Sequence, residues 1–213
     1  MGVVMDDWRE KYAYPSRWKT EKITLVCTSL NPDEKLLNKM RDSAKGFDHI
    51  EIRIESQHNP LPIPRAYNIL IDNVKTEWVC VFCDDDYFYP QGLSKMIQEI
   101  HLGIDADVAH FKFHISGYQP LQDIRALIKG SSYNLCEKKP ITTQLLSKHN
   151  RLPAGSFFRK SAWEKVGGFQ GEKHHDWDLW LRMSQAGLRF KYFDNLVYNM
   201  VRRKNSAWMR QHK

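Results

Sequence analysis

Three consecutive carboxylates, Asp84, Asp85 and Asp86, directly follow the most apolar run of the chain, residues 78–83. Neighbouring like charges repel one another and are costly to desolvate unless a cation neutralises them. Oxygen ligands of this kind suit Mg²⁺ or Mn²⁺ that carries a phosphate group. The cluster therefore predicts a divalent-cation site with Asp86 and Asp84 as ligands. A solvated acidic turn or a helix N-cap cluster before Pro90 is the alternative interpretation.

The apolar run before this cluster predicts a strand buried on both faces, because it is short and rich in β-branched and aromatic residues. In sheets that helices cover on both sides, ligands bind at the carboxyl ends of the strands. This placement favours the cation site over the acidic turn. A calcium-binding EF-hand loop is excluded, because Phe88 and Tyr89 stand where that loop needs an acidic or amide side chain and then glycine.

A second acidic segment, residues 174–183, follows a glycine pair near the C-terminus. Its apolar spacing predicts a helix that Gly187 can end, with Asp176 at or just before the first turn. The positive end of the helix dipole favours a carboxylate there by roughly 0.3–1 kcal/mol. A carboxylate held ionised at such a junction can act as a general base. The alternative is that Asp176 only caps the helix.

Composition and charge limit the classes of protein that need to be considered. With 213 residues and 42% hydrophobic content, the chain can bury one core, which predicts a single domain. We expect an arm over residues 1–21, a catalytic domain over 22–206 and a basic tail over 207–213. The net charge of +7 favours polyanionic partners such as nucleic acid, anionic lipid or a nucleoside diphosphate. No apolar stretch approaches the roughly 20 residues that span a bilayer, and the first residues do not match a signal peptide, so we expect a soluble, cytoplasmic protein.

The four cysteines are expected to be thiols of the core, not disulfides or zinc ligands. Cys27, Cys80 and Cys83 lie in apolar runs, and no second C-x-x-C accompanies the pair at 80 and 83. His174 and His175 also lack a zinc-binding pattern. We expect one of these histidines to contact a substrate.

Strand and helix patterns alternate along the chain, which predicts an α/β fold with a mainly parallel central sheet between two layers of helices. Residues 117–150 show weak periodicity and could hold loops over a site. Strands are expected at 23–28, 50–55, 78–83 and 108–115. A first helix is expected to begin at Asn31 with Pro32 in its first position, and a second over residues 65–74. Two further helices are expected, one from Pro90 and one over the segment after His174.

Taken together, these segments resemble the GT-A glycosyltransferases, in particular the family 2-like enzymes that use nucleotide-diphosphate sugars. The resemblance covers residues 23–206 and implies the Rossmann-like GT-A fold. The matching pieces come in the family's order and each lies on a different element, so the set is more specific than the DxD motif alone. They are Thr28-Ser29, Ala66-Tyr67-Asn68, Asp84-Asp85-Asp86, and Gly167-Gly168-Phe169 followed by residues 175–182.

The resemblance implies transfer of one hexosyl or pentosyl group from a nucleotide-diphosphate sugar, most simply a UDP-sugar, to an acceptor hydroxyl. A divalent cation, Mn²⁺ or Mg²⁺, would assist the departing diphosphate, and Asp176 would be the base of an inverting displacement. The donor nucleotide would be bound by Thr28, Ser29, Glu55, Arg65, Asn68, Asp84 and Asp85. Contacts to the acceptor or to phosphate would come from His175, Trp177 and Arg203.

The chain departs from the family pattern at positions that the resemblance assigns to donor, acceptor and phosphate contacts. Glu55 stands where Asp is more common, and His175 replaces the usual Glu before the base. Arg203 lies near the usual position of a His, so an arginine could contact phosphate and reduce the dependence on metal. The Gln-x-x-Arg-Trp signature of processive synthases is absent, which favours single additions.

The sequence leaves the acceptor and two other classes of protein open. The acceptor could be a glycan, a lipid-linked sugar or a nucleic acid such as a hydroxylated base in viral DNA. A nucleotidyltransferase shares a similar sheet and carboxylate site, but it would want a glycine- and lysine-rich loop where residues 28–32 stand. A non-catalytic nucleotide-sugar binder would keep the carboxylate cluster without the base.

Overall fold

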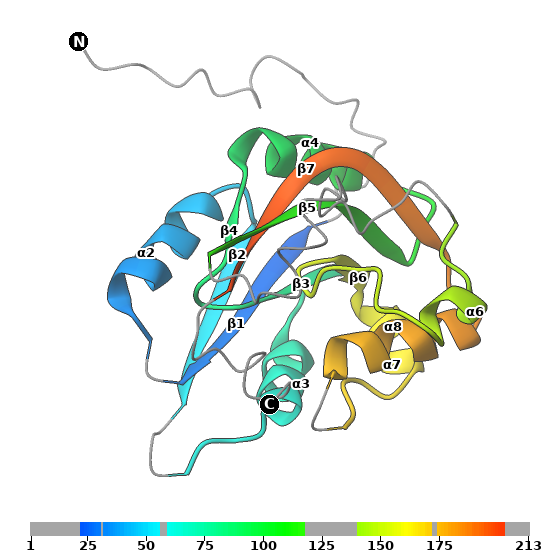
Figure 1. Ribbon diagram of the computed structural model, residues 1–213, viewed down its shortest axis with the longest axis horizontal. Coiled ribbons are helices and arrows are strands. Elements are labelled where there is room, and N and C mark those ends of the chain that lie inside the picture. The colour runs from blue at the N-terminus through cyan, green and yellow to red at the C-terminus, as the bar shows by residue number, and fades with distance from the viewer. Residues whose placement is uncertain (1–21, 31, 56–58, 118–139, 172–173, 203–213) are drawn as a thin grey trace.

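The computed structural model describes residues 22–30, 32–55, 59–117, 140–171 and 174–202 (Figure 1). These residues form one seven-stranded sheet in the order β2-β1-β3-β6-β5-β7-β4. The predicted arm and tail lie outside the described residues. The strands are β1 (Ile23–Leu30), β2 (His49–Glu55), β3 (Trp78–Phe82), β4 (Tyr87–Phe88), β5 (Val108–Gly117), β6 (Phe157–Arg159) and β7 (Phe190–Arg202). The helices are α2 (Glu34–Ser43), α3 (Ile63–Asn73), α4 (Pro90–His101), α6 (Thr143–Leu146), α7 (Lys160–Lys165) and α8 (His175–Gln185).

The long strand pairings are parallel, which confirms the predicted mainly parallel sheet. β1 pairs in parallel with β2 and β3, and β5 pairs in parallel with β7. The antiparallel pairings involve the short strands β4 and β6. β4 and β6 were not predicted, because two or three residues are too few to show an alternating pattern. The 13-residue strand β7 was not predicted either.

Strand β3 is buried on both faces, as its composition predicted. Its side chains alternate between two apolar clusters, so that Cys80 and Phe82 face α2 and α4 while Val79 and Val81 face α3 and α8. Helices therefore cover both faces of the sheet, which confirms the three-layer arrangement (Figure 1).

Helix α2 begins later than the sequence pattern predicted. Asp33 is its N-cap residue, and the Asp33 carboxylate accepts hydrogen bonds from the backbone N–H groups of Lys35 and Leu36. The predicted cap at Asn31 with Pro32 in the first helical position is therefore wrong. A carboxylate that satisfies two of the first N–H groups fixes the start of the helix at Glu34.

The carboxyl ends of the first three strands lie at one edge of the sheet. In the parallel registers, Cys27 pairs with Phe82 and Leu30 pairs with Glu55. The residues that follow β1 and β3 must therefore meet at this edge. Among the described residues, no helix is long and apolar enough to cross a membrane.

Candidate functional site

The acidic turn lies at the carboxyl end of β3, next to the end of β1. The Ser29 hydroxyl donates a hydrogen bond to Oδ2 of Asp84. Ser29 is buried and Asp84 is half-buried, so this contact lies at the base of the turn. Two residues predicted to bind the donor nucleotide are thus brought together from positions 55 residues apart.

Asp86 is the most deeply buried of the three carboxylates, with an exposed fraction of 3%. Its Oδ2 accepts a hydrogen bond from the Tyr198 hydroxyl, and its Oδ1 accepts one from the backbone N–H of Val201 at 2.7 Å. Burial and the neighbouring Asp85 carboxylate raise the pKa of Asp86 well above its ordinary value, and the two hydrogen bonds offset this only in part. A cation beside Asp86 would favour its charged form.

Tyr198 is held in place by tight packing from β3 and from the loop before β6. Its ring lies edge-on to Phe82 with centroids 5.2 Å apart. A Cβ atom added at Gly155 would lie 2.9 Å from Cε2 of Tyr198, so only glycine leaves room for the ring. Neither Tyr198 nor Gly155 could be identified from the sequence, because their roles depend on contacts between distant segments.

Three side chains of the turn could hold a cation together. The Cys83 thiol and one carboxylate oxygen each of Asp85 and Asp86 lie within 4.8 Å of one another. Two carboxylates and a thiol are a donor set that divalent cations accept. Asp84, predicted as a ligand with Asp86, is not in this group, so its part in cation binding stays a prediction.

Cys83 is exposed, whereas Cys27 and Cys80 are buried. The prediction of a core thiol at Cys83 is therefore wrong, because β3 ends at Phe82 and Cys83 already belongs to the turn. These three cysteines are free thiols, as the sequence predicted, and the fourth, Cys136, lies outside the described residues.

Asp176 lies in the first turn of α8, as predicted. The N-cap residue is His174, which has a left-handed backbone (φ 51°), and no side chain caps the helix there. The Asp176 carboxylate instead accepts a hydrogen bond from Nδ2 of Asn150 at 3.0 Å. Oδ1 of Asn150 in turn accepts one from the backbone N–H of Leu152 at 3.2 Å. Asp176 is therefore oriented by a fixed amide and is not the N-cap residue of α8.

The neighbouring acid, Asp178, has a different role in the structure. Arg182 pairs with Asp178 at 2.7 Å and also donates to the backbone carbonyls of Val166 (2.5 Å) and Gly168 (2.8 Å). Asp178 thus helps Arg182 to hold the glycine loop against α8.

Asn68 holds this loop from the other side. Its Nδ2 donates to the carbonyl of Phe169, and the Phe169 N–H donates to its Oδ1, both at 2.9 Å. The adjacent Tyr67 hydroxyl donates to the carbonyl of Phe82 at 2.7 Å, at the end of β3. Helix α3 therefore ties the glycine loop to the strand that carries the acidic turn. The role predicted for Asn68, in donor binding, stays a prediction.

His175 and Trp177 flank Asp176 but point to different neighbours. The His175 ring lies 5.7 Å from that of Phe169, and burial lowers the pKa of His175, which favours the neutral imidazole. The Trp177 indole N–H donates to the carbonyl of Leu146 at 2.6 Å and so anchors α6.

The remaining predicted site residues stay predictions. Thr28 is half-buried at the end of β1, and Arg65 is exposed on α3. The side chain of Glu55 and the whole of Arg203 lie outside the described residues.

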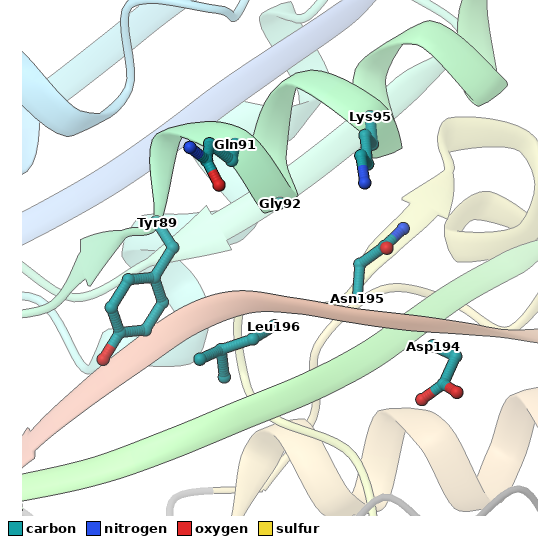
Figure 2. Close-up of a pocket in the computed structure, with 7 residues that line it drawn as sticks. All are labelled: Tyr89, Gln91, Gly92, Lys95, Asp194, Asn195 and Leu196. Carbon is teal, nitrogen blue, oxygen red and sulfur yellow. The ribbon is translucent and has the colours of Figure 1, made fainter.

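A separate open pocket of about 300 Å³ lies between α4 and β7 (Figure 2). It contains none of the predicted site residues. Its lining consists of Tyr89, Gln91, Gly92, Lys95, Asp194, Asn195 and Leu196.

Comparisons with known proteins bear on the fold. No protein-family model matches the chain, and no curated protein has a significantly similar sequence. Among solved structures, residues 1–349 of S. aureus TarS, a family 2 glycosyltransferase, match with a TM-score of 0.61 and 14% identity over 84% of this chain. The same protein in complex with UDP-GlcNAc matches with a TM-score of 0.63 and 13% identity over 87% of this chain.

The chain has the GT-A fold. It spans about 60% of the length of TarS 1–349. The complex of TarS 1–349 with UDP also matches, with a TM-score of 0.60 and 12% identity over 86% of this chain and 61% of that one. The fold predicted from the ordered motifs is therefore confirmed.

Proposed function

We propose that this GT-A protein is an inverting glycosyltransferase that moves one sugar from a nucleotide-diphosphate sugar, most simply a UDP-sugar, to an acceptor hydroxyl. The carrying observation is the acidic turn at the carboxyl end of β3, where the carboxylates of Asp85 and Asp86 converge. The likeness in fold to TarS, which was solved with UDP-GlcNAc and with UDP, supports a donor of this class.

The carboxylates of the turn would bind the donor's diphosphate through a divalent cation, Mg²⁺ or Mn²⁺. A cation held there would neutralise the negative charge that builds on the departing diphosphate. Tyr198 and the Val201 backbone N–H keep Asp86 in position for this task. Ser29 and Asp84, joined by a hydrogen bond at the end of β1, would contact the nucleoside.

Asp176 would remove the proton from the acceptor hydroxyl as the hydroxyl attacks the sugar carbon. Its carboxylate is oriented by Asn150, whereas Asp178 is engaged by Arg182. Attack from the side opposite the leaving group inverts the anomeric configuration, so the base and the diphosphate site must lie on opposite sides of the sugar.

The test is donor binding followed by product analysis. We expect a UDP-sugar to bind in calorimetry with Mn²⁺ and to bind at least about tenfold more weakly with EDTA or in Asp86→Asn, because a ligand of the cation is lost. Equal binding under all three conditions would refute the role of the turn. NMR of the product, or of the slowly hydrolysed donor, should show inversion, whereas nucleotidyl transfer from the same donor would instead release the sugar 1-phosphate.

The acceptor class is tested in the same assay. The net charge of +7 is compatible with a nucleic-acid acceptor. Turnover that depends on added DNA and falls steeply with salt would support that acceptor. Turnover that is indifferent to DNA would favour a glycan or lipid-linked acceptor.

A further inference from the structure

The thiol of Cys83 lies beside the two carboxylates to which the proposed function assigns the cation. Its Sγ is within 4.8 Å of the oxygens of Asp85 and Asp86 that complete the group. Cys83 is partly accessible to ions and reagents in solution, although burial and the carboxylates of Asp86 and Asp85 raise the pKa of its thiol. The site therefore combines one soft sulfur donor with two hard oxygen donors.

We propose that Cys83 is a ligand of the cation site and makes this site bind thiophilic divalent cations, Zn²⁺ or Cd²⁺, more tightly than Mg²⁺. Thiolate ligands favour soft metals, whereas carboxylates alone suit Mg²⁺ and Mn²⁺. The inference rests on the proposed function in one respect, which is that the turn is a cation site.

The three proposed ligands differ in how firmly the structure holds them. Asp86 is buried and fixed by hydrogen bonds from Tyr198 and Val201, so it is the rigid member. Zn²⁺ bonds to sulfur at about 2.3 Å and to carboxylate oxygen at about 2.0–2.2 Å. The three donor atoms lie within 4.8 Å of one another, so Cys83 and Asp85 need at most small side-chain shifts toward Asp86 to share one ion. Cys83 can make such a shift because it lies in the turn, outside the hydrogen-bonded ladder of β3.

Coordination by Cys83 needs no oxidant or other reactant. The thiol proton leaves to solvent as the bond between Sγ and the metal forms, and the cation takes its place. Zn²⁺ and Mg²⁺ would compete for the same two carboxylates. We therefore expect the thiophilic ions to displace Mn²⁺ from the protein.

The test is a titration of the full chain with Cd²⁺, monitored by the ultraviolet charge-transfer absorption band of cadmium thiolate. We expect the absorbance of this band to level off at one Cd²⁺ per chain in the wild type and the band to be absent in Cys83→Ser. The affinity for Cd²⁺ should fall about tenfold or more in Cys83→Ser, while the affinity for Mn²⁺, measured by electron paramagnetic resonance, should change less than about threefold. Cys136→Ser is the matched control and should keep the band.

Alkylation gives a second measurement that does not depend on any variant. Iodoacetamide should modify Cys83 in the folded protein, as mapped by mass spectrometry, and one equivalent of Cd²⁺ should protect it. Cys27 and Cys80 are internal controls that should not react, because both are buried.

Several results would overturn the inference. A band that persists in Cys83→Ser, or alkylation of Cys83 that Cd²⁺ does not slow, would show that the thiol is not a ligand. A wild type that binds a UDP-sugar with Mn²⁺ but gives no band would refute the role of Cys83 and leave the proposed function standing. A protein that gives the band but binds no nucleotide sugar would support the thiol ligand and refute the proposed function.

Discussion

Asp176 and Asp178 lie two positions apart on α8, yet their partners predict opposite consequences of mutation. Asp176→Asn keeps the size of the side chain and an oxygen that can accept from Asn150. We expect turnover to fall by about two to four orders of magnitude, because the general base is lost, while folding and donor binding persist. Steady-state kinetics and calorimetry of donor binding measure the two effects separately.

Asp178→Asn is the matched control for this prediction. It removes the charge that pairs with Arg182 at a half-exposed site, so the free energy of unfolding should fall by about 1 kcal/mol or less. Turnover of the folded protein should stay near that of the wild type. A near wild-type rate in Asp176→Asn, or a product that retains the donor's anomeric configuration, would contradict the assignment of Asp176.

At the scale of elements, the position of Asp86 depends on how α4 packs against β7, the strand that carries Tyr198 and Val201. Gly92 of α4 lies directly over β7, and a Cβ atom added there would be 1.9 Å from the carbonyl oxygen of Leu196. We expect Gly92→Ala to lower the free energy of unfolding by about 3 kcal/mol or more, because the helix and strand must move apart. The affinity for Mn²⁺ should also fall, since the partners of Asp86 move with β7.

Gln91→Ala is the control for this packing contact. Gln91 is the exposed neighbour of Gly92 in the same helical turn, so its replacement should change stability by less than about 0.5 kcal/mol. Urea denaturation and Mn²⁺ titration should be done on both variants. If Gly92→Ala is as stable as Gln91→Ala, the close contact between α4 and β7 does not position the site.

At the scale of the whole molecule, one buried histidine makes folding stability depend on pH. His110 lies in β5 with an exposed fraction of 1%, and burial lowers its pKa to about 4. In the unfolded chain a histidine has a pKa of about 6.5. Between these two values only the unfolded chain takes up the proton. The contribution of His110 to stability should therefore decrease as pH falls from about 6.5 toward about 4, by about 1.4 kcal/mol per pH unit.

Urea denaturation at pH 7 and at pH 5 measures this dependence. We expect His110→Phe to lose less stability than the wild type over the interval, because one proton fewer binds on unfolding. His149→Ala, at an exposed position, should keep the wild-type dependence. An unchanged dependence in His110→Phe would show that other groups cause the loss.

The sequence by itself determined the elements whose signals are local. The apolar run 78–83 predicted a strand buried on both faces, and the carboxylates after it were predicted at the carboxyl end of this strand, where the structure places them. The apolar spacing of residues 174–183 likewise predicted the helix α8 and placed Asp176 near its start. These features depend on residues within a few positions of one another, so periodicity and helix-end preferences suffice to find them.

Only the tertiary structure decided which partner each carboxylate has. Asp84 accepts from Ser29, 55 residues away, and Asp86 accepts from Tyr198, 112 residues away. Asp176 accepts from Asn150, 26 residues away, and Cys83 joins the cation group because β3 ends one residue before it. No local pattern encodes such contacts, because a hydrogen bond between distant segments depends on how the intervening helices and strands pack.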